Sequence, residues 1–291
     1  VPGGAKQHGD MPVMAAGVHL AGVERCPRRI AMLLHRQRIH VGAQPDHRPV
    51  RSAADDPDDA GGRHAGDHLV HPEGGEADAA DAIAAADGLL FYDMAGYSFG
   101  DGAVTMRPPS SAFRQAVAAR FASGRGAVAM HHALAGWALW PEWHDWLGGQ
   151  FHYQPGAHGQ DSGYRHDVAY EAHVVADHPV TRGLPASFPV TDELYLCPID
   201  ESAFTPLVRA EGFAFTRDNF YSAAQAVAGA MFSNEGWEHP PGSNCIAWES
   251  RNCPAPLVYL QCGDGPATYT NPNVRRMLSQ ALDYTSGGTA P

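Results

Sequence analysis

The stretch from Ala127 to Trp137 constrains the fold most, because a short apolar run ends in two adjacent histidines. It reads Ala-Val-Ala-Met-His-His-Ala-Leu-Ala-Gly-Trp. This pattern is typical of a buried strand that delivers polar side chains to its carboxyl end. In open α/β sheets that edge binds ligands, near the point where the strand order reverses. We therefore expect a cleft beside His131 and His132.

The segment before this stretch predicts a strand, a loop and a helix. Residues 89–92 form a short apolar run, which indicates a buried parallel strand that delivers Asp93 to its carboxyl end. Residues 94–109 are expected to be a long loop that lines the cleft and carries Tyr97. A helix is predicted from Ser110 to Ser123, with Ser110 as its N-cap. Strand, helix and strand in this order imply a right-handed parallel crossover.

The rest of the chain continues this alternation. Further strands are predicted at residues 69–70, 164–176, 193–197, 206–209, 245–248 and 257–261, and further helices at 76–86, from Pro141, and from Asn271-Pro272 to about Tyr284. We expect one doubly wound α/β domain over about 67–285, with a mostly parallel central sheet and helices on both faces, followed by a tail at 286–291.

Residues 1–66 differ in composition from the remainder of the chain. They hold 9 of the 20 Lys and Arg residues but only 7 of the 32 acidic residues. Their low apolar content and mixed charge are typical of a poorly ordered or non-native segment, such as one translated out of frame. A genuine N-terminal βα unit is the alternative, and residues 29–34 are its one ordered-looking apolar stretch. On the first reading, a chain that begins at about residue 67 should stay folded.

Charge and cysteine usage narrow the functional classes. The formal net charge of -12 argues against a nucleic-acid partner, which would require a basic surface. No apolar run is long enough for a membrane span, and no secretory signal is recognised, so a cytoplasmic location is expected. The five cysteines lack a CxxC pair and are predicted to be reduced thiols. A neutral small molecule is the expected partner, and the sequence is compatible with a homo-oligomer.

Several motifs, taken in order, resemble a ThuA-like (trehalose utilization) domain over about residues 68–285. They are His131-His132-Ala133-Leu134 with Trp137, Gly148-Gly149-Gln150-Phe151, Asp177-His178-Pro179-Val180-Thr181-Arg182-Gly183-Leu184, Asp192-Glu193-Leu194-Tyr195 and the Asn271-Pro272 helix. The resemblance implies a flavodoxin-like fold related to class I glutamine amidotransferases. It also implies a link to bacterial carbohydrate metabolism.

The chain departs from the patterns of these families at three places. The usual opening, a strand followed by a Gly-Gly turn and a histidine, is not recognisable in residues 1–66. After the last strand, where Gly-His-Asp is common, this chain has Cys262-Gly263-Asp264, so no histidine role is carried over. His131 occupies the turn that holds the amidotransferase cysteine. Imidazole cannot form the usual thioester, so a cysteine-dependent glutamine amidotransferase is not expected.

The candidate catalytic residues are His131, Asp192 and Glu193. His131 is expected to act as an acid, a base or a metal ligand, and a carboxylate from Asp192 or Glu193 to be its partner. Strand alternation sends these two carboxylates to opposite faces, so only one should reach the cleft. His131 should face the cleft, whereas His132 packs beneath the turn. A divalent metal such as zinc, held by His131 and Glu193, is the cofactor considered.

The candidate substrate-binding residues share aromatic or hydrogen-bonding side chains near the predicted strand ends and loops. Flat rings with polar groups nearby suit a sugar, whose ring faces are apolar and whose edge carries hydroxyls. Three strand histidines, His152, His166 and His173, are weaker ligand candidates. The substrate-binding set is Asp93, Tyr97, His132, Trp137, Tyr195, Asn219, Tyr221, Trp237 and Asp264.

These observations predict an enzyme that acts on a sugar or keto-sugar derivative, as a hydrolase or a lyase, in a cleft at the carboxyl ends of the strands. The alternative is a non-catalytic sugar-binding or regulatory protein that keeps the cleft but lacks competent chemistry. Stoichiometric zinc in the purified protein would favour catalysis.

Overall fold

The computed structural model describes residues 30–33, 68–70, 76–155 and 160–287. The helices are α1 (Glu76–Ala85), α2 (Ser111–Ala122), α3 (Pro141–Leu147), α4 (Ala223–Val227), α5 (Pro266–Thr270) and α6 (Pro272–Thr285). The strands are β1 (Ile30–Leu33), β2 (His68–Val70), β3 (Gly88–Phe91), β4 (Tyr97–Gly100), β5 (Ala103–Met106), β6 (Ala127–Met130), β7 (Gly163–Val174), β8 (Ser187–Leu196), β9 (Phe204–Glu211), β10 (Tyr221–Ser222), β11 (Cys245–Ser250) and β12 (Leu257–Leu260).

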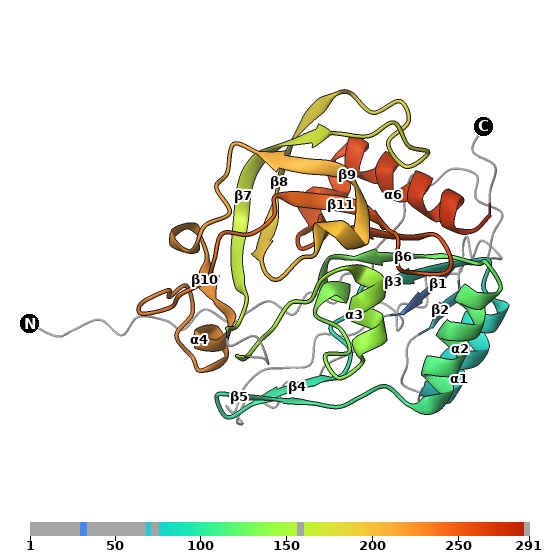
Figure 1. Ribbon diagram of the computed structural model, residues 1–291, viewed down its shortest axis with the longest axis horizontal. Coiled ribbons are helices and arrows are strands. Elements are labelled where there is room, and N and C mark those ends of the chain that lie inside the picture. Colours follow the sequence, from blue (N-terminus) through green and yellow to red (C-terminus); the bar gives the residue numbers. More distant parts are fainter. Residues whose placement is uncertain (1–29, 34–67, 71–75, 156–159, 288–291) are drawn as a thin grey trace, which may run out of the picture.

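One sheet runs through the described molecule (Figure 1). Its strand pairing changes from parallel to antiparallel at β12. From β2 through β1, β3 and β6 to β12, neighbouring strands are parallel. From β12 onward β11, β9 and β7 pair antiparallel, and β7 also pairs with β8 and β10. The predicted α/β, flavodoxin-like fold is confirmed, and the antiparallel strands extend its parallel core.

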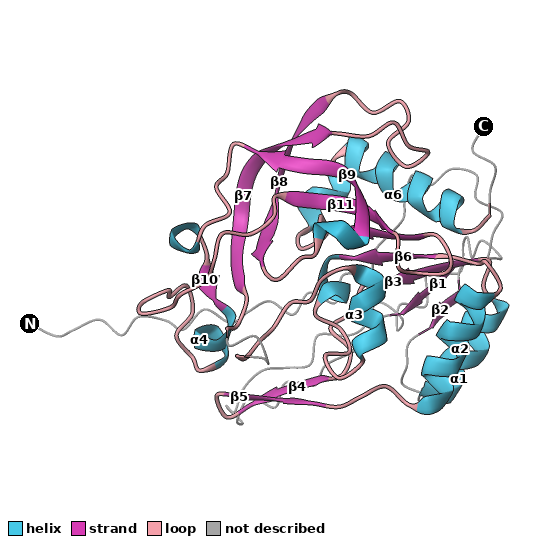
Figure 2. Cartoon of the chain, viewed as in Figure 1, coloured by secondary structure: helices cyan, strands magenta, loops and turns pink. Residues whose placement is uncertain are grey.

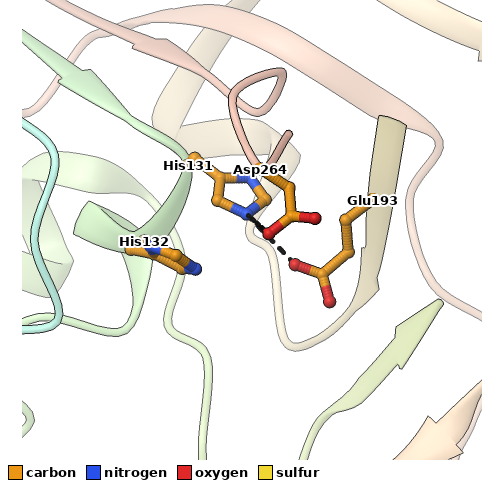
Figure 3. Close-up of side chains that lie close together, drawn as sticks. All are labelled: His131, His132, Glu193 and Asp264. Atoms are coloured by element: carbon orange, nitrogen blue, oxygen red, sulfur yellow. Dashed lines mark hydrogen bonds and ion pairs between the residues drawn. The ribbon is translucent and has the colours of Figure 1, made fainter. Parts of the chain in front are cut away.

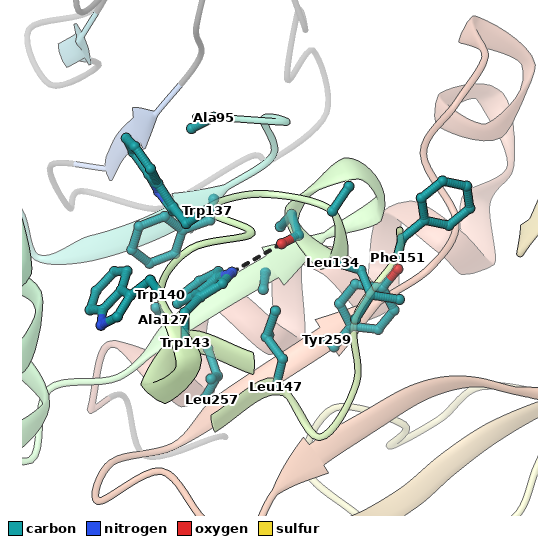
Figure 4. Packing of buried hydrophobic residues seen from close by; sticks show 14 of the residues in the cluster. Ala95, Ala127, Leu134, Trp137, Trp140, Trp143, Leu147, Phe151, Leu257 and Tyr259 are labelled. Carbon is teal, nitrogen blue, oxygen red and sulfur yellow. Dashed lines mark hydrogen bonds between the residues drawn. The ribbon is translucent and has the colours of Figure 1, made fainter. Parts of the chain in front are cut away.

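Helices cover both faces of the parallel half (Figure 2). Successive residues of β3 and β6 alternate between two cores: Leu89 packs with α1 and α2, whereas Leu90 packs with α6. Figure 4 shows the first core, where Trp143 and Leu147 of α3 lie among strand residues. None of the described helices has the length and hydrophobicity that a membrane span requires.

Local sequence signals explain the helix before β6. The Ser110 hydroxyl accepts a hydrogen bond from the Phe113 amide at 3.1 Å, which caps the first turn of α2. Phe113, Val117 and Phe121 recur every four residues and are buried against the sheet. Arg120 donates to the Ala86 and Asp87 carbonyls at the end of α1 and to the Gly126 carbonyl before β6. Arg120 therefore ties the segment after α1 to the residue that precedes β6.

The prediction of a long loop at 94–109 is wrong, because this segment contains the antiparallel hairpin of β4 and β5. Asp101 and Gly102 form the turn, with φ of +52° and +71°. Positive φ at both central residues is the geometry that Asp-Gly favours in two-residue hairpins. The Asp-Gly pair between the apolar residues of 97–100 and 103–106 is the sequence signal for this hairpin.

Only residues 30–33 of the compositionally distinct segment 1–66 are described, and they form β1. The apolar stretch predicted at 29–34 is thus a strand, with β2 on one side and β3 on the other. The expectation of disorder or a non-native frame for the other residues up to 66 lies outside the described residues, as does the end of the tail at 288–291.

The position of β1 reverses the outcome expected for a truncated chain. A chain that begins at residue 67 loses an inner strand and leaves β2 and β3 without their shared neighbour, so its Tm should fall by several degrees or its unfolding should cease to be cooperative. Each 1 kcal/mol lost at this size lowers Tm by about 2–4 °C. Calorimetry should compare the Tm of three chains: the full chain, one starting at residue 28 and one starting at residue 67. Equal Tm values for all three would show that β1 contributes nothing.

Candidate active site

The chain turns sharply at His131, directly after β6. His131 has φ of +47° and begins a 3-10 helix over His131–Leu134. Left-handed backbone is uncommon outside glycine and is often retained at functional sites, where surrounding contacts impose it. Here the Tyr259 hydroxyl donates to the His131 carbonyl at 3.0 Å. The turn aims the imidazole away from solvent and under the ends of β8 and β12.

The His131 side chain is fully buried and hydrogen-bonded through both ring nitrogens. Nδ1 donates to the Gln261 carbonyl at 2.6 Å, and Nε2 lies 3.1 Å from Glu193 Oε2 and 2.7 Å from Tyr195 Oη. Burial alone would lower the pKa of His131, but the carboxylates of Asp264 and Glu193 outweigh it and raise the pKa to about 10. His131 is therefore a cation at neutral pH.

Two further side chains join this pair. His131 Nε2 lies 3.7 Å from Asp264 Oδ1, and His166 Nδ1 lies 3.4 Å from Glu193 Oε1 and 3.6 Å from Asp264 Oδ2. We call His131, His166, Glu193 and Asp264 the charged cluster. His131 and Glu193 form its buried floor, whereas His166 and Asp264 are each one-third exposed. A bound molecule would reach the cluster from the side of His166 and Asp264.

Asp264 is held in place by contacts to the backbone around it. Asp192 accepts hydrogen bonds from the amides of Gly263 at 2.6 Å and Asp264 at 3.1 Å. The Gly263 carbonyl accepts from the Tyr92 and Tyr269 hydroxyls. A side chain at Gly263 would place its Cβ 2.9 Å from Met130 Cε and 3.2 Å from His131 Cβ, so only glycine allows this approach.

Of the two adjacent carboxylates, of which one was expected to reach the cleft, only Glu193 is in the charged cluster. The two side chains do leave β8 differently, but both meet the same loop after β12. Asp192 binds the backbone amides of that loop, and Glu193 lies beside the Asp264 side chain. Asp192 is therefore a positioning residue, and Glu193 is the carboxylate within the charged cluster.

The exposure of the two adjacent histidines is the reverse of the expectation. His131 is the buried one, and His132 is partly exposed, with its ring 4.4 Å from the His131 ring and 5.5 Å from the Tyr92 ring (Figure 3). Burial of the imidazole and then the charge on His131 lower the pKa of His132 to about 3. His132 is therefore neutral, which leaves it able to bind a cation.

Four side chains at the site could act together as ligands of a metal ion. His131, His132, Glu193 and Asp264 each offer one ligand atom, and these atoms lie within 4.8 Å of one another (Figure 3). Imidazole and carboxylate donors suit zinc. His131 would have to lose its proton first, so metal binding would compete with the ion pair to Glu193 and depend on pH.

The remaining predicted binding residues have varied surroundings. Tyr195 contacts His131, and Asp93 is half-buried in the loop that follows β3. Tyr221 is half-buried on β10, beside Tyr164. The others have packing or turn contacts: Trp137 with Phe113, Tyr97 with Phe99 and Tyr153, Trp237 with Asp161, and Asn219 with the Ala214 carbonyl.

His166, only a weaker ligand candidate in the sequence analysis, is a member of the charged cluster. Period-2 alternation along β7 gave it no distinct face, and β7 is irregular between Arg165 and Val168, with Asp167 at φ of +55°. Such a bulge re-aims side chains next to it. Of the other strand histidines, His173 is exposed near the far end of β7.

The described cysteines are all free, in agreement with the expected reduced thiols. Cys262 precedes the Gly263-Asp264 loop, but it is buried and lies 3.3 Å from the Tyr170 hydroxyl. Burial raises the pKa of its thiol to about 12. A neutral thiol is a poor nucleophile, so this environment argues against thiol chemistry at the site.

The family model identifies the family, and solved structures show the fold. The family model ThuA, described as "Trehalose utilisation", matches residues 79–285. A solved ThuA-like protein from Bacteroides uniformis aligns with a TM-score of 0.52 at 15% identity, over 90% of this chain and 92% of its own. One from Parabacteroides merdae gives 0.53 at 12% identity, with the same coverage. At these identities the structural likeness shows the fold. No curated protein matches the sequence significantly.

The ion pair of His131 should make stability fall at alkaline pH. Because folding raises the pKa of His131 from 6.5 to about 10, its stabilising contribution is complete below pH 6.5 and is lost as pH rises through 10. Tm measured between pH 6 and pH 10 should therefore decline. His131→Asn tolerates positive φ but carries no charge, so its Tm should be lower and flatter across this range. A variant with the same decline as the parent would place the titrating group elsewhere.

Proposed function

This chain belongs to the ThuA family, described as trehalose utilisation, and on that premise we propose that it is an enzyme acting on a sugar or sugar derivative at the charged cluster. The observation that carries the proposal is the convergence of two imidazoles and two carboxylates from four segments of the chain. Groups of opposite ionisation, close together and partly exposed, are what acid-base catalysis requires.

His166 and Glu193 have the positions of an acid and a base. The Asp264 carboxylate, 3.6 Å away, raises the pKa of His166 despite its burial, which favours the protonated form that an acid needs. Glu193 Oε1 faces His166, whereas Oε2 faces His131. In hydrolysis Glu193 would take a proton from water and His166 would give one to the leaving oxygen. In elimination Glu193 would take the proton from carbon instead.

His131 and Asp192 would support these groups without touching the substrate. The His131 imidazole bonds to Glu193 Oε2 at 3.1 Å and so fixes the position of that buried carboxyl group. Asp192 fixes the loop that carries Asp264, and Asp264 orients the His166 ring. His131 therefore becomes a positioning residue in this proposal, instead of the proton-transfer group that its place after β6 suggested.

Replacing the acid His166 should lower turnover and spare the fold, whereas replacing the base Glu193 should lower turnover and also lower Tm, because it leaves the buried His131 cation unpaired. His166→Gln and Glu193→Gln each remove a proton-transfer group, which is worth about 10²–10⁴ in rate. The substrates to assay are trehalose, related disaccharides and their keto derivatives. His173→Gln is the matched control, because it changes an exposed histidine of the same strand. Its turnover should equal that of the parent.

The results also distinguish an enzyme from a binding protein. The expected result is turnover in the parent that both cluster variants lose, with the Tm of His166→Gln within a few degrees of the parent and that of Glu193→Gln lower. Sugar binding without turnover in any chain would favour the non-catalytic sugar-binding or regulatory alternative. Parent-level turnover in both variants would move the chemistry to another site.

A metal-dependent enzyme is the second candidate, favoured by the four ligand atoms of His131, His132, Glu193 and Asp264. Elemental analysis of protein purified without chelator should then find about one zinc or similar ion per chain. The variant His132→Ala should lose that ion and keep its fold, because His132 is only partly buried and is outside the His131–Glu193 pair. Substoichiometric metal in the parent, with no gain in turnover on adding zinc, would reject the metal-dependent candidate and leave acid-base catalysis as the remaining one.

A further inference from the structure

Phe232 is an exposed aromatic residue in a strained conformation. It is 59% exposed, more than the other exposed large apolar side chains of the described residues. Its φ is +58°, which is rare for a bulky side chain. Neither burial nor backbone preference explains phenylalanine here, since glycine or asparagine would suit the turn better. Strain of this kind is retained mainly at ligand sites.

The turn that carries Phe232 is fixed to the sheet. The Phe232 amide donates to the Tyr164 hydroxyl at 3.1 Å, and that hydroxyl contacts Met231 Sδ at 3.9 Å. The Ser222 amide of β10 donates to the Ser233 carbonyl at 2.9 Å. Since β10 pairs with the start of β7, the ring is held at a defined place relative to both strands.

Tyr164, Tyr221 and Phe232 form what we call the aromatic wall. The ring centroid of Phe232 lies 5.6 Å from that of Tyr221 and 6.4 Å from that of Tyr164. The guanidinium of Arg165 lies over the Tyr221 ring at 4.7 Å and supplies hydrogen-bond donors beside the wall. The wall therefore combines flat apolar faces with polar groups at its margin.

The aromatic wall adjoins the charged cluster through His166. The His166 ring lies 5.2 Å from the Tyr164 ring and 6.2 Å from the Phe232 ring, while its Nδ1 faces Glu193 and Asp264. A molecule that reaches the cluster past His166 would meet Phe232 next. The exposed ring of Phe232 is thus a direct neighbour of His166, the proposed proton donor.

We propose that Phe232 stacks on the non-reacting ring of a disaccharide-like glycoside whose other ring lies at the charged cluster. A sugar ring has apolar C–H faces that pack on an aromatic ring, and its hydroxyls would bond to polar groups at the wall margin. This inference rests on the proposed function, which already includes disaccharides, and deepens it by giving the second ring a place beside the cluster. It also assigns a specificity residue, Phe232.

The test compares a two-ring and a one-ring sugar. Calorimetric titration of the full chain should show tighter binding of trehalose than of glucose. Phe232→Ala should weaken trehalose binding about tenfold, roughly the effect of one good aromatic contact, and leave glucose binding unchanged. Phe232→Trp should retain the preference. Val175→Ala is the control, because Val175 is an exposed apolar residue just beyond the other end of β7.

A stability readout separates stacking from a structural role. Phe232→Gly relieves the positive φ, so its Tm should stay level or rise by about 2 °C while the trehalose preference is lost. Unchanged trehalose binding in the alanine and glycine variants would overturn the inference and leave the proposed function standing. Equal losses for trehalose and glucose would also overturn it, since Phe232 would then contact the reacting ring. No sugar binding by the parent would overturn both proposals.

Discussion

A buried imidazole held between the Gln261 carbonyl and the Glu193 carboxylate is the interaction on which the site depends. A charge in this environment is costly without its partner, so neither His131 nor Glu193 is stable there alone. The pair also explains the left-handed backbone at His131, because only that turn directs the ring under β8 and β12. The partly exposed groups, His166 and Asp264, are then arranged around an ionised floor.

Local signals predicted much of the fold. Apolar runs identified β3 and β6, and the serine and asparagine caps identified the starts of α2 and α6, because these features act within a few residues. The hairpin of β4 and β5 was missed although its Asp-Gly turn is also a local signal. β1 was recognisable only as a short apolar stretch, since nothing in its own residues shows that it pairs on both sides.

The site was predictable only in part, because its contacts join distant segments. His131 was expected to have Asp192 or Glu193 as its partner, since His131 follows one predicted strand and the two carboxylates enter another. The role of Asp192 depends on a loop after β12, and the burial of His131 instead of His132 depends on the packing of β8 over the turn. The alternation of side chains along a strand could not predict the direction of His166, because the irregular stretch of β7 decides which way it points.

The same long separations bear on how the chain acquires its site during folding. The His131 contacts to Glu193 and Gln261 span 62 and 130 residues. They also connect the parallel half of the sheet to its antiparallel extension. Contacts of this kind require large loops to close and form slowly. A refolding chain would therefore regain helical signal and compactness before the charged cluster assembles, which makes the titration of His131 a reporter of the last step of folding.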